Sequence, residues 1–472
     1  MTRGGAARAV SYGAGSLLTA IGSIFLLRHL GLVDFGRYGT VMALLTIVGG
    51  FTEGGLTTTA TRDMALLAPG TERRSLLRDL LALRVVLSTI GIGVAVVFAV
   101  IAGYDSTLVF GTFIAGLGIV LVSAQAAFLV PLSVDLRNGR VAVSEMFRQG
   151  LLVVGIIILA LGGSGLGGFF VNQLLAAVVL VAISPFVVGR ANVAIPHWNW
   201  GRSRTLLREA APLAIVTVLG TVYFRVLVIV TSLLTDDRQT ALFVTSSRIF
   251  ELLIGLPLLL SGIVLPVLTV AARDDPGRFR YVNQRLTELA FLCGALICLI
   301  LVIGSHPILV VLGGDQYGAV APVLRLQAPM IVTLFLISAW NPALIALRRQ
   351  RAMAIVTGIG LLASVTAGLV LIPLFDARGA SVAAVFAELF TAGGTFLVLW
   401  RAGPGRELHF GWLPRALAVV GAAFAVGLLC PGSDAVRTVV ACAVFVVGAA
   451  ALRLLPQELL HAIGRHPSDR VR

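Results

Sequence analysis

The sequence predicts an all-α polytopic membrane protein with about 14 transmembrane helices, namely two six-helix bundles followed by two C-terminal helices. The chain of 472 residues has a mean hydropathy of +0.99, and only 12% of its residues are charged. A soluble domain carries about a quarter charged residues. The apolar residues also come in long blocks, and blocks of about 18 or more predict membrane-spanning helices.

The expected spans follow these blocks along the chain. The first block comes after Arg3 and Arg8, as in a signal peptide, but without a small-residue cleavage site, so we expect it to remain as the first helix. A tight glycine-rich connection, GGSGLGG, separates the fifth and sixth spans. The spans are expected at residues 11–30, 38–61, 79–102, 107–133, 142–162, 166–189, 210–234, 240–271, 285–304, 318–347, 352–374, 379–400, 413–430 and 435–455.

The arginines predict the orientation of these spans. All 36 basic residues are arginines, and with the N-terminus inside, 28 fall in inner segments, 5 in outer segments and 3 within spans. Positive charge stays on the cytoplasmic side, so we expect a multi-pass protein of the cytoplasmic (inner) membrane with both termini in the cytoplasm. The net charge of +14 then reflects the inner loops and some attraction to anionic lipids, and does not indicate nucleic-acid binding. Arg84 is counted with the inner segments, and Asp79 is interpreted as interfacial.

The longest inner connection suggests the domain organisation. It reads RANVAIPHWNWGRSRTLLRE, follows six spans, and contains Trp198 and Trp200, which are typical of interfacial anchors. We therefore expect an N-terminal six-helix bundle at 1–189, a cytoplasmic linker at 190–209, a C-terminal six-helix bundle at 210–400, and two extra helices with a cytoplasmic tail at 401–472.

Five charged residues lie within spans of the second bundle, all in its outer half. At about 1.5 Å per residue from the outer end of each helix, the depths are about 12 Å for Arg248, 16 Å for Glu251, 13 Å for Arg225, 10 Å for Arg325 and 15 Å for Glu388. An ionisable residue at the bilayer centre costs roughly 2.5–3.5 kcal/mol, so such residues generally face a bundle interior or a wet cavity.

Two interpretations of these charges are open. In the first, they only neutralise one another: Arg248 and Glu251 lie three residues apart on one helix, and Arg225 could pair with Glu388. In the second, they line a wet, net-positive cavity for an anionic ligand. We favour the second because apolar packing would cost less than five buried charges. Arginine suits phosphate because its planar donors bind two oxygens at once.

Other features add to this prediction. Glu53 of the first bundle lies about 22 Å from the outer end of its helix and is a further candidate cavity charge. Prolines interrupt two spans, with Pro257 and Pro266 in 240–271 and Pro329 and Pro342 in 318–347. Proline kinks helices, so these two spans are candidates for bent gating elements.

No motif for chemistry is present in the sequence. It contains no Walker loop, no HExxH and no nucleophile with a matching base, and its glycine-rich strings follow no predicted strand. The four cysteines lack metal-ligand or redox spacing. We therefore expect a protein that is not an enzyme and that uses no cofactor or metal.

Several stretches resemble one family, the bacterial polysaccharide (O-antigen type) flippases of the multidrug/oligosaccharidyl-lipid/polysaccharide exporter superfamily. The resemblance covers about residues 11–400, and its order and spacing are more specific than any single motif. It rests on LRHLGLVDFGRYGTVMALLTIVGGFTEGGLTTTATRDMA, on TSSRIFELLIGLPLLLSGIVLPVLTVAAR, and on the run from LGGDQYGAVAPVLRLQAP to IPLFDARGASVAAVFAEL.

The resemblance implies two six-helix bundles that form a V, a central cavity, and alternating access. Arg248 falls at the place of an arginine that lipid II flippases of the same superfamily carry early in the eighth helix, which supports it as a diphosphate contact. Arg28 lies in the arginine and Leu-Gly element of the first motif and is a further substrate-binding candidate, with Arg225 and Arg325. The chain departs from many family members at Leu227, where they carry an acid two residues after the arginine of the seventh helix.

The expected function is a flippase that moves a polyprenyl-diphosphate-linked oligosaccharide from the inner to the outer leaflet for cell-surface polysaccharide biosynthesis. Alternatives are a lipid II flippase or a multidrug/toxic-compound exporter of the same superfamily. A membrane glycosyltransferase or polymerase is less favoured because the outer loops are short. Expected partners are the lipid-linked oligosaccharide, membrane lipids, and glycosyltransferases and a polymerase of the same pathway, with no nucleic acid and a monomeric state.

Overall fold

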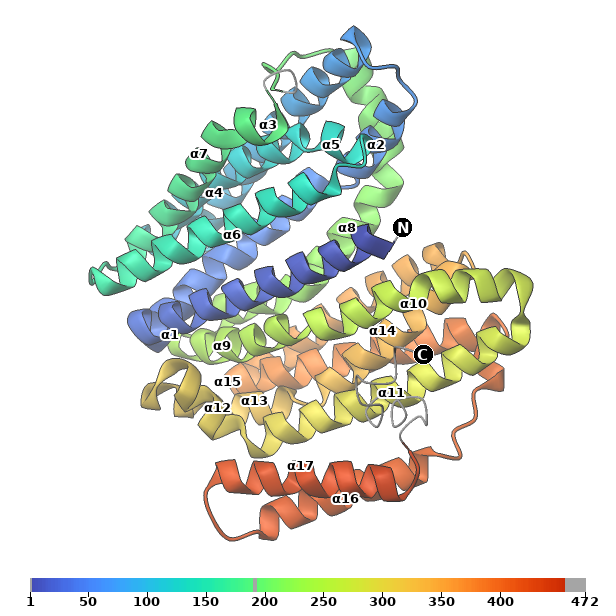
Figure 1. Cartoon of the computed structure of the whole chain (residues 1–472). Coiled ribbons are helices and arrows are strands. Elements are labelled where there is room, and N and C mark those ends of the chain that lie inside the picture. Colours follow the sequence, from blue (N-terminus) through green and yellow to red (C-terminus); the bar gives the residue numbers. More distant parts are fainter. Residues whose placement is uncertain (1, 190–192, 455–472) are drawn as a thin grey trace, which may run out of the picture. The chain divides into compact units, whose positions relative to one another are not determined.

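The computed structural model describes residues 2–189 and 193–454, whose regular structure is entirely helical (Figure 1). Contacts group the chain into two compact units, Met1–Thr245 and Ser246–Arg472, so that the boundary falls within one helix, α9. The domain boundaries expected from the sequence stay a prediction. Residues 190–192 of the expected linker and 455–472 of the expected tail lie outside the described residues.

The first unit contains eight helices and the start of a ninth. Its first part holds two long helices joined by a short one, and its last long helix follows the linker. The elements are α1 (Thr2–Glu53), α2 (Leu56–Ala65), α3 (Thr71–Ile101), α4 (Ser106–Phe128), α5 (Val130–Val134), α6 (Asn138–Leu161), α7 (Leu166–Val188), α8 (Trp200–Leu234) and the beginning of α9 (Asp237–Leu253).

The second unit contains the end of α9 and the remaining helices of the described chain. These are α10 (Gly255–Asp274), α11 (Pro276–Ile303), α12 (Ser305–Gly313), η2 (Asp315–Val320), α13 (Ala321–Gln327), α14 (Met330–Ala346), α15 (Gln350–Arg401), η3 (Pro404–Glu407), α16 (Leu413–Leu429) and α17 (Asp434–Ala451).

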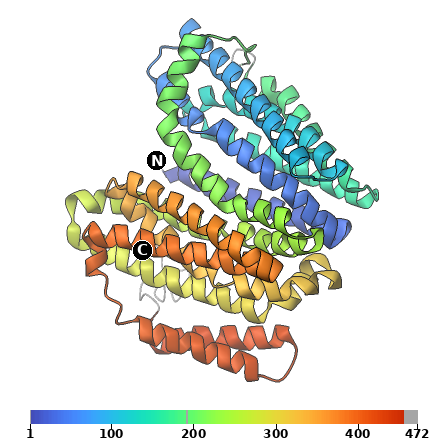
Figure 2. The same cartoon turned by 180° about the vertical axis from the view of Figure 1, so that it is seen from behind.

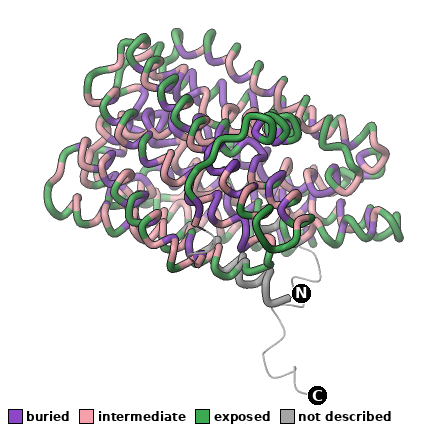
Figure 3. Tube along the Cα trace, turned by 90° about the horizontal axis from the view of Figure 1, so that it is seen from above, coloured by how far each residue is buried: buried purple, intermediate pink, exposed green. Residues whose placement is uncertain are grey.

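Many of these helices have the length and composition of membrane spans. Ten of the described helices are long and apolar enough to cross a bilayer, or eleven if the bent pair α13–α14, with η2, counts as one span. Buried and exposed residues alternate along the helices (Figure 3). Large apolar side chains such as Leu362, Val370 and Val439 are more than 60% exposed, which suits contact with lipid. The protein is therefore an all-α polytopic membrane protein.

Two long helices each cover two expected spans. A continuous helix of 52 residues, the length of α1 and of α15, would extend about 78 Å, more than twice the roughly 30 Å hydrocarbon core. The backbone leaves helical geometry at Gly31 in α1 and at Asp376 in α15. A side chain at Gly379 would lie 2.0 Å from the carbonyl oxygen of Leu371, so this second break requires glycine. The expected number of about 14 spans includes α16, whose 17 residues make it shorter than the other candidate spans. This number therefore stays a prediction.

Close helix packing in the first unit depends on glycine. A Cβ at Gly111 of α4 would lie 2.4 Å from the ring of Phe170 in α7, and one at Gly118 would lie 3.0 Å from the carbonyl oxygen of Gln173. Small residues let membrane helices approach closely, and dispersion contacts then hold the helices together. The face of α4 that carries these glycines therefore packs directly on α7.

The two last helices pack on one long helix of the second unit. Leu292, Leu299 and Ile303 of α11 form a core with residues of α16 and α17, including Ala423 and Phe445. Figure 2 shows α16 and α17 as a neighbouring pair. The expected pair of extra C-terminal helices is therefore part of this unit's core.

The segment that leads into α8 is held against the start of α3. Arg78 Nε donates to the carbonyl oxygen of Ile195 (3.2 Å), and the His197 amide donates to the carbonyl oxygen of Arg78 (3.3 Å). Arg202 Nη1 donates to Asp79 Oδ2 (2.9 Å) and to Ser75 Oγ (2.7 Å). Only 1% of the Asp79 side chain is exposed, because the linker folds over it. The interpretation of Asp79 as interfacial stays a prediction.

The packing of α4 on α7 predicts a specific sensitivity to added volume. Substituting Gly111→Ala forces a methyl group into the Phe170 ring, so we expect a loss of roughly 1–3 kcal/mol in stability, seen as a lower melting temperature in detergent. Gly93→Ala in α3 is the matched control, because a Cβ there meets no atom within 4 Å. Equal melting temperatures for the two variants would contradict this packing.

The buried carboxylate of Asp79 gives a second test. Removing its partner by Arg202→Ala leaves Asp79 buried beside His197 alone, and we expect a loss of about 1–3 kcal/mol. Arg204→Ala, at an exposed position on the same helix, should change the melting temperature little. If both variants melt like the parent protein, the linker is not anchored through Asp79.

Candidate functional site

An ion pair lies on α9, within the span that the sequence singles out. Arg248 Nη1 and Glu251 Oε2 are 2.7 Å apart, and the two residues lie three positions apart on the same face of the helix. The side chains are 31% and 26% exposed. The pair is therefore only partly covered by the rest of the protein.

The helix that carries this pair breaks just beyond it. α9 ends at Leu253 and α10 begins at Gly255, within one expected span. Pro257 has no N–H to bond the carbonyl oxygen of Leu253, which favours a break at this point. Arg248 and Glu251 thus lie on the last two turns of a helix that ends within the expected span 240–271.

Arg325, on the short helix α13, is held by the neighbouring helix. Its side chain is exposed, and Nε donates to Ser305 Oγ at the start of α12 (2.7 Å). α13 and α14 meet at an angle of 50°, next to Pro329, which cannot donate to the carbonyl oxygen of Arg325. The bend expected for this span is confirmed; a gating role stays a prediction.

Polar side chains join α9 to α13 next to both arginines. Ser246 Oγ donates to Gln327 Oε1 (2.6 Å), and Gln327 Nε2 donates to Ser247 Oγ (3.4 Å). Both helices are expected to run from the outer side inward. Arg248 then lies two residues deeper than Ser246, and Arg325 two residues shallower than Gln327, an axial offset of about 6 Å. The two arginines are therefore offset by about one helical turn, and each lies on another face of its helix than the contact residues Ser246 and Gln327.

The second carboxylate of this unit lies deeper in the protein. Glu388 of α15 is 2% exposed and lies among buried alanines at positions 383, 384 and 387. Its environment is therefore closed in this structure, unlike the half-buried pair on α9. Its assignment as a cavity charge partner stays a prediction.

Three candidates belong to the first unit. Arg28 is exposed in the first part of α1, close to the break at Gly31, and Arg225 is half-buried on α8. Glu53 is exposed at the end of α1 and accepts a hydrogen bond from Thr57 Oγ1 (3.2 Å). The roles expected for these three side chains stay predictions.

The most buried arginine of the described chain is one that sequence analysis assigned to an inner segment. Arg84 on α3 is 1% exposed, and its Nη1 donates to the carbonyl oxygen of Ser123 (3.2 Å) while Nη2 donates to Thr57 Oγ1. Its Nε has no hydrogen-bond partner, and Thr57 links it to Glu53. Its count with the inner segments did not predict that Arg84 is buried between helices. The sequence did contain a signal of this burial, because Arg84 lies five residues inside the predicted span 79–102.

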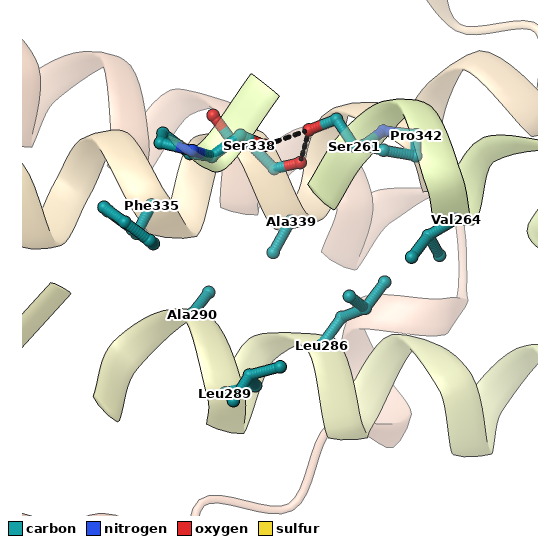
Figure 4. A pocket seen from close by; sticks show the side chains of 10 residues that line it. Ser261, Val264, Leu286, Leu289, Ala290, Phe335, Ser338, Ala339 and Pro342 are labelled. Carbon is teal, nitrogen blue, oxygen red and sulfur yellow. Dashed lines mark hydrogen bonds between the residues drawn. The ribbon is translucent and has the colours of Figure 1, made fainter. Parts of the chain in front are cut away.

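A small opening in the second unit lies between α10, α11 and α14 (Figure 4). It is lined by apolar side chains and two serines. Ser261 Oγ donates to the carbonyl oxygen of Ser338 (2.6 Å), which Pro342 leaves without its helical donor. The lining has no charged side chain, so this opening is not suited to an anionic headgroup.

The titratable residues do not form a metal centre in the described part of the chain. Among residues 2–189 and 193–454, no group of three or more His, Cys, Asp or Glu side chains could hold a metal ion. All four cysteines are free thiols. The candidate site is therefore described by its arginines, carboxylates and hydroxyl groups.

Solved structures with the same architecture are transport proteins. The lipid II flippase MurJ in an inward closed conformation matches with a TM-score of 0.80 at 11% identity, over 96% of this chain and 99% of that chain. An inward-facing multidrug resistance MATE family transporter of the MOP superfamily matches with a TM-score of 0.67 at 13% identity, over 84% and 99%. A MOP superfamily transporter from Pyrococcus furiosus, described as having a binding pocket of reverse polarity, gives 0.55 at 14%, over 85% and 96%. Identities this low show a shared fold only.

Sequence comparison gives the family. No curated protein matches the chain. A family model described as "Polysaccharide biosynthesis protein" matches residues 1–272, which is more than half of the chain. The protein therefore belongs to the polysaccharide biosynthesis protein family, and its fold is that of the MOP superfamily.

Proposed function

We propose that this protein is a flippase that moves a polyprenyl-diphosphate-linked oligosaccharide from the inner to the outer leaflet of the cytoplasmic membrane for cell-surface polysaccharide biosynthesis. One observation carries the proposal: a member of the polysaccharide biosynthesis family folds like a lipid II flippase over 96% of its length. The family suggests a saccharide pathway, and the fold suggests movement of a lipid-linked precursor.

The arginines on α9 and α13 support an anionic headgroup as the cargo. Arg248 is half-buried beside Glu251, and Arg325 is exposed beside Ser305. Guanidinium groups bind phosphate oxygens through charge-assisted, often paired hydrogen bonds. In this mechanism, these arginines bind the phosphate oxygens of the diphosphate.

The remaining candidates have supporting roles in this mechanism. Glu251 keeps the Arg248 guanidinium oriented when no cargo is bound and releases it when phosphate oxygens arrive. Arg28 and Arg225 add positive charge for the headgroup, whereas Glu53 and Glu388 balance the charge once it has left. Alternating access then exposes the site to the outer side, and the lipid tail stays in the bilayer.

The other assignments follow from this proposal. The protein lies in the inner membrane with both termini in the cytoplasm, functions as a monomer, and receives its cargo from glycosyltransferases and delivers it to a polymerase. It performs no chemical step itself. An ion gradient supplies direction, because the sequence has no nucleotide-binding motif.

The alternatives differ in cargo. A lipid II flippase would carry the same diphosphate with a different saccharide, whereas a toxic-compound exporter would carry cations. The MATE and Pyrococcus structures cover only 84–85% of this chain. The uncovered share is about as long as residues 401–472, which contain the two extra C-terminal helices. The lipid II flippase covers 96%. This difference favours a lipid-linked cargo over a drug.

Arg248 provides the first test of this function. In vesicles that contain a labelled polyprenyl-diphosphate oligosaccharide, Arg248→Ala should slow flipping about 10-fold or more, because a charged hydrogen bond is worth about 1.5–3 kcal/mol. Arg248→Lys should recover only part of the rate, since an ammonium cannot bind two oxygens in a planar fork. Arg238→Ala, at an exposed position in the first turn of α9, is the matched control. Flipping by Arg248→Ala at the parental rate would remove this ligand assignment.

The cargo class can be tested with the unmodified protein. We expect transport of the diphosphate-linked oligosaccharide and no transport of a cationic drug. The same saccharide on a monophosphate carrier should move at least about tenfold more slowly, because a monophosphate offers the arginines fewer charged oxygens. The measurement is the rate at which labelled substrate reaches the opposite leaflet. Preference for lipid II over other saccharides would establish the first alternative, and transport of the cation would establish the second.

A further inference from the structure

Two connections of the first unit are joined by one arginine on the expected inner side. Arg73, in the first turn of α3, donates from Nε to the carbonyl oxygen of Leu67 (2.8 Å), just after α2. Its Nη1 lies 3.3 Å from Asp135 Oδ1, just after α5. The helices α2 and α5 themselves lie side by side (Figure 1). We call the following residues the Arg73 surface: 66–67, 73–74 and 135–140.

Within this surface, Leu136 has a backbone conformation that glycine normally adopts. It follows the end of α5 and has a φ of 58°. Its amide donates to the carbonyl oxygen of Ser133 (3.2 Å), and the next amide, of Arg137, donates to that of Leu132 (2.8 Å). In this pattern of helix end the left-handed residue is most often glycine. A leucine there is strained, because its Cβ crowds the neighbouring backbone.

Other helix ends with the same two hydrogen bonds differ between the two expected sides of the membrane. On the outer side the left-handed residue is glycine, namely Gly103 after α3 and Gly163 after α6. On the inner side of the second unit it is an arginine, namely Arg348 after α14 and Arg453 after α17. The helix end itself would be better served by glycine at position 136. The strain therefore indicates a role for the leucine side chain outside the fold.

Two leucines of the Arg73 surface are highly exposed. The exposed fraction is 82% for Leu66 and 81% for Leu136. They lie five and three residues beyond the expected spans 38–61 and 107–133, which at about 1.5 Å per residue places them within about 8 Å of the hydrocarbon. The headgroup region is roughly 5–8 Å deep on each side of a bilayer. Both leucines are therefore at the depth of the lipid headgroups.

The charged side chains around these leucines are mainly basic. Asp135 is already paired with Arg73, and Glu72 is the other carboxylate of these segments. Guanidinium groups bind phosphate oxygens through charge-assisted hydrogen bonds. Near an anionic membrane surface, each arginine strengthens binding about fivefold. Three arginines of the surface are exposed: Arg74, Arg137 and Arg140.

We propose that the Arg73 surface binds the headgroup of an anionic phospholipid, such as phosphatidylglycerol, and anchors the inner end of the first unit in the membrane. The exposed arginines hold the phosphate, and the two leucines enter the lipid beside it. Arg73 keeps the two connections together, so that both contribute to one site. This inference does not depend on the cargo of the protein.

The experiment maps lipid contacts on the full-length protein in nanodiscs of phosphatidylcholine. Two photoreactive probes carry a diazirine at the start of one acyl chain and differ only in the headgroup, phosphatidylglycerol or phosphatidylcholine. The readout is the yield of adducts on the tryptic peptide 63–73, which contains Leu66. We expect at least about tenfold more adducts from the anionic probe. Equal labelling by both probes would overturn the proposal.

Removing two arginines across the surface tests the charge. Arg137→Ser with Arg140→Ser leaves the peptide 63–73 unchanged, and it should lower the yield from the anionic probe about tenfold or more. The matched control is Arg349→Ser with Arg351→Ser, at exposed positions on the expected inner side of the second unit. It removes the same charge and should leave this peptide's labelling at the parental level. Parental labelling of the first variant, or an equal loss in both, would contradict a local site.

Leu136→Gly separates a role in lipid contact from a role in the fold. Glycine adopts the left-handed conformation without strain, so the melting temperature in detergent should stay the same or rise. The yield from the anionic probe should still fall about threefold or more, because an apolar contact with the lipid is lost. A lower melting temperature with parental labelling would show that Leu136 serves the fold and would remove it from the site.

Discussion

Hydrocarbon offers no hydrogen-bond partners, and this constraint organises the whole molecule. Every backbone N–H and C=O inside the bilayer has to be satisfied within the protein, which leaves helices as the available structure for this chain. The same constraint explains local details. Ser261 bonds the carbonyl oxygen of Ser338 that Pro342 leaves open, and Gln327 bonds two serines of α9. Polar side chains thus donate hydrogen bonds to carbonyl oxygens that prolines leave open, and they connect neighbouring helices.

Buried charged side chains also need hydrogen-bond partners within the protein, and a charge that lacks them costs more free energy than a neutral polar group. Arg84 is fully buried and yet uses only a carbonyl oxygen, a hydroxyl and, through Thr57, the nearby Glu53. Asp79 is equally buried but bonds Arg202 directly. Arg248 and Glu251 differ from both because they keep about a third to a quarter of their side chains exposed. The pair on α9 is therefore less enclosed by the protein than Arg84 and Asp79.

The proposed function connects these observations. The fold and family suggest a lipid-linked saccharide as cargo, and the arginines suggest how its diphosphate is held. Rigid neighbours around a binding group reduce the cost of ordering it when a ligand arrives. A hydrogen-bonded register between α9 and α13 supplies such rigidity next to a helix that breaks at Ile254.

The sequence by itself determined the class of fold, because the length of its apolar blocks is measured against a fixed bilayer thickness. It also located the helix reversals near Gly31 and Asp376, the bend near Pro329 and the neighbourhood of Arg248 and Glu251, since residues three apart share one helix face. Only the tertiary structure decided that Arg84 and Asp79 are buried and that Gln327 faces Ser246, 81 positions away. Helical periodicity tells which residues share a face, but the helix that lies opposite is chosen by packing between segments far apart in the chain.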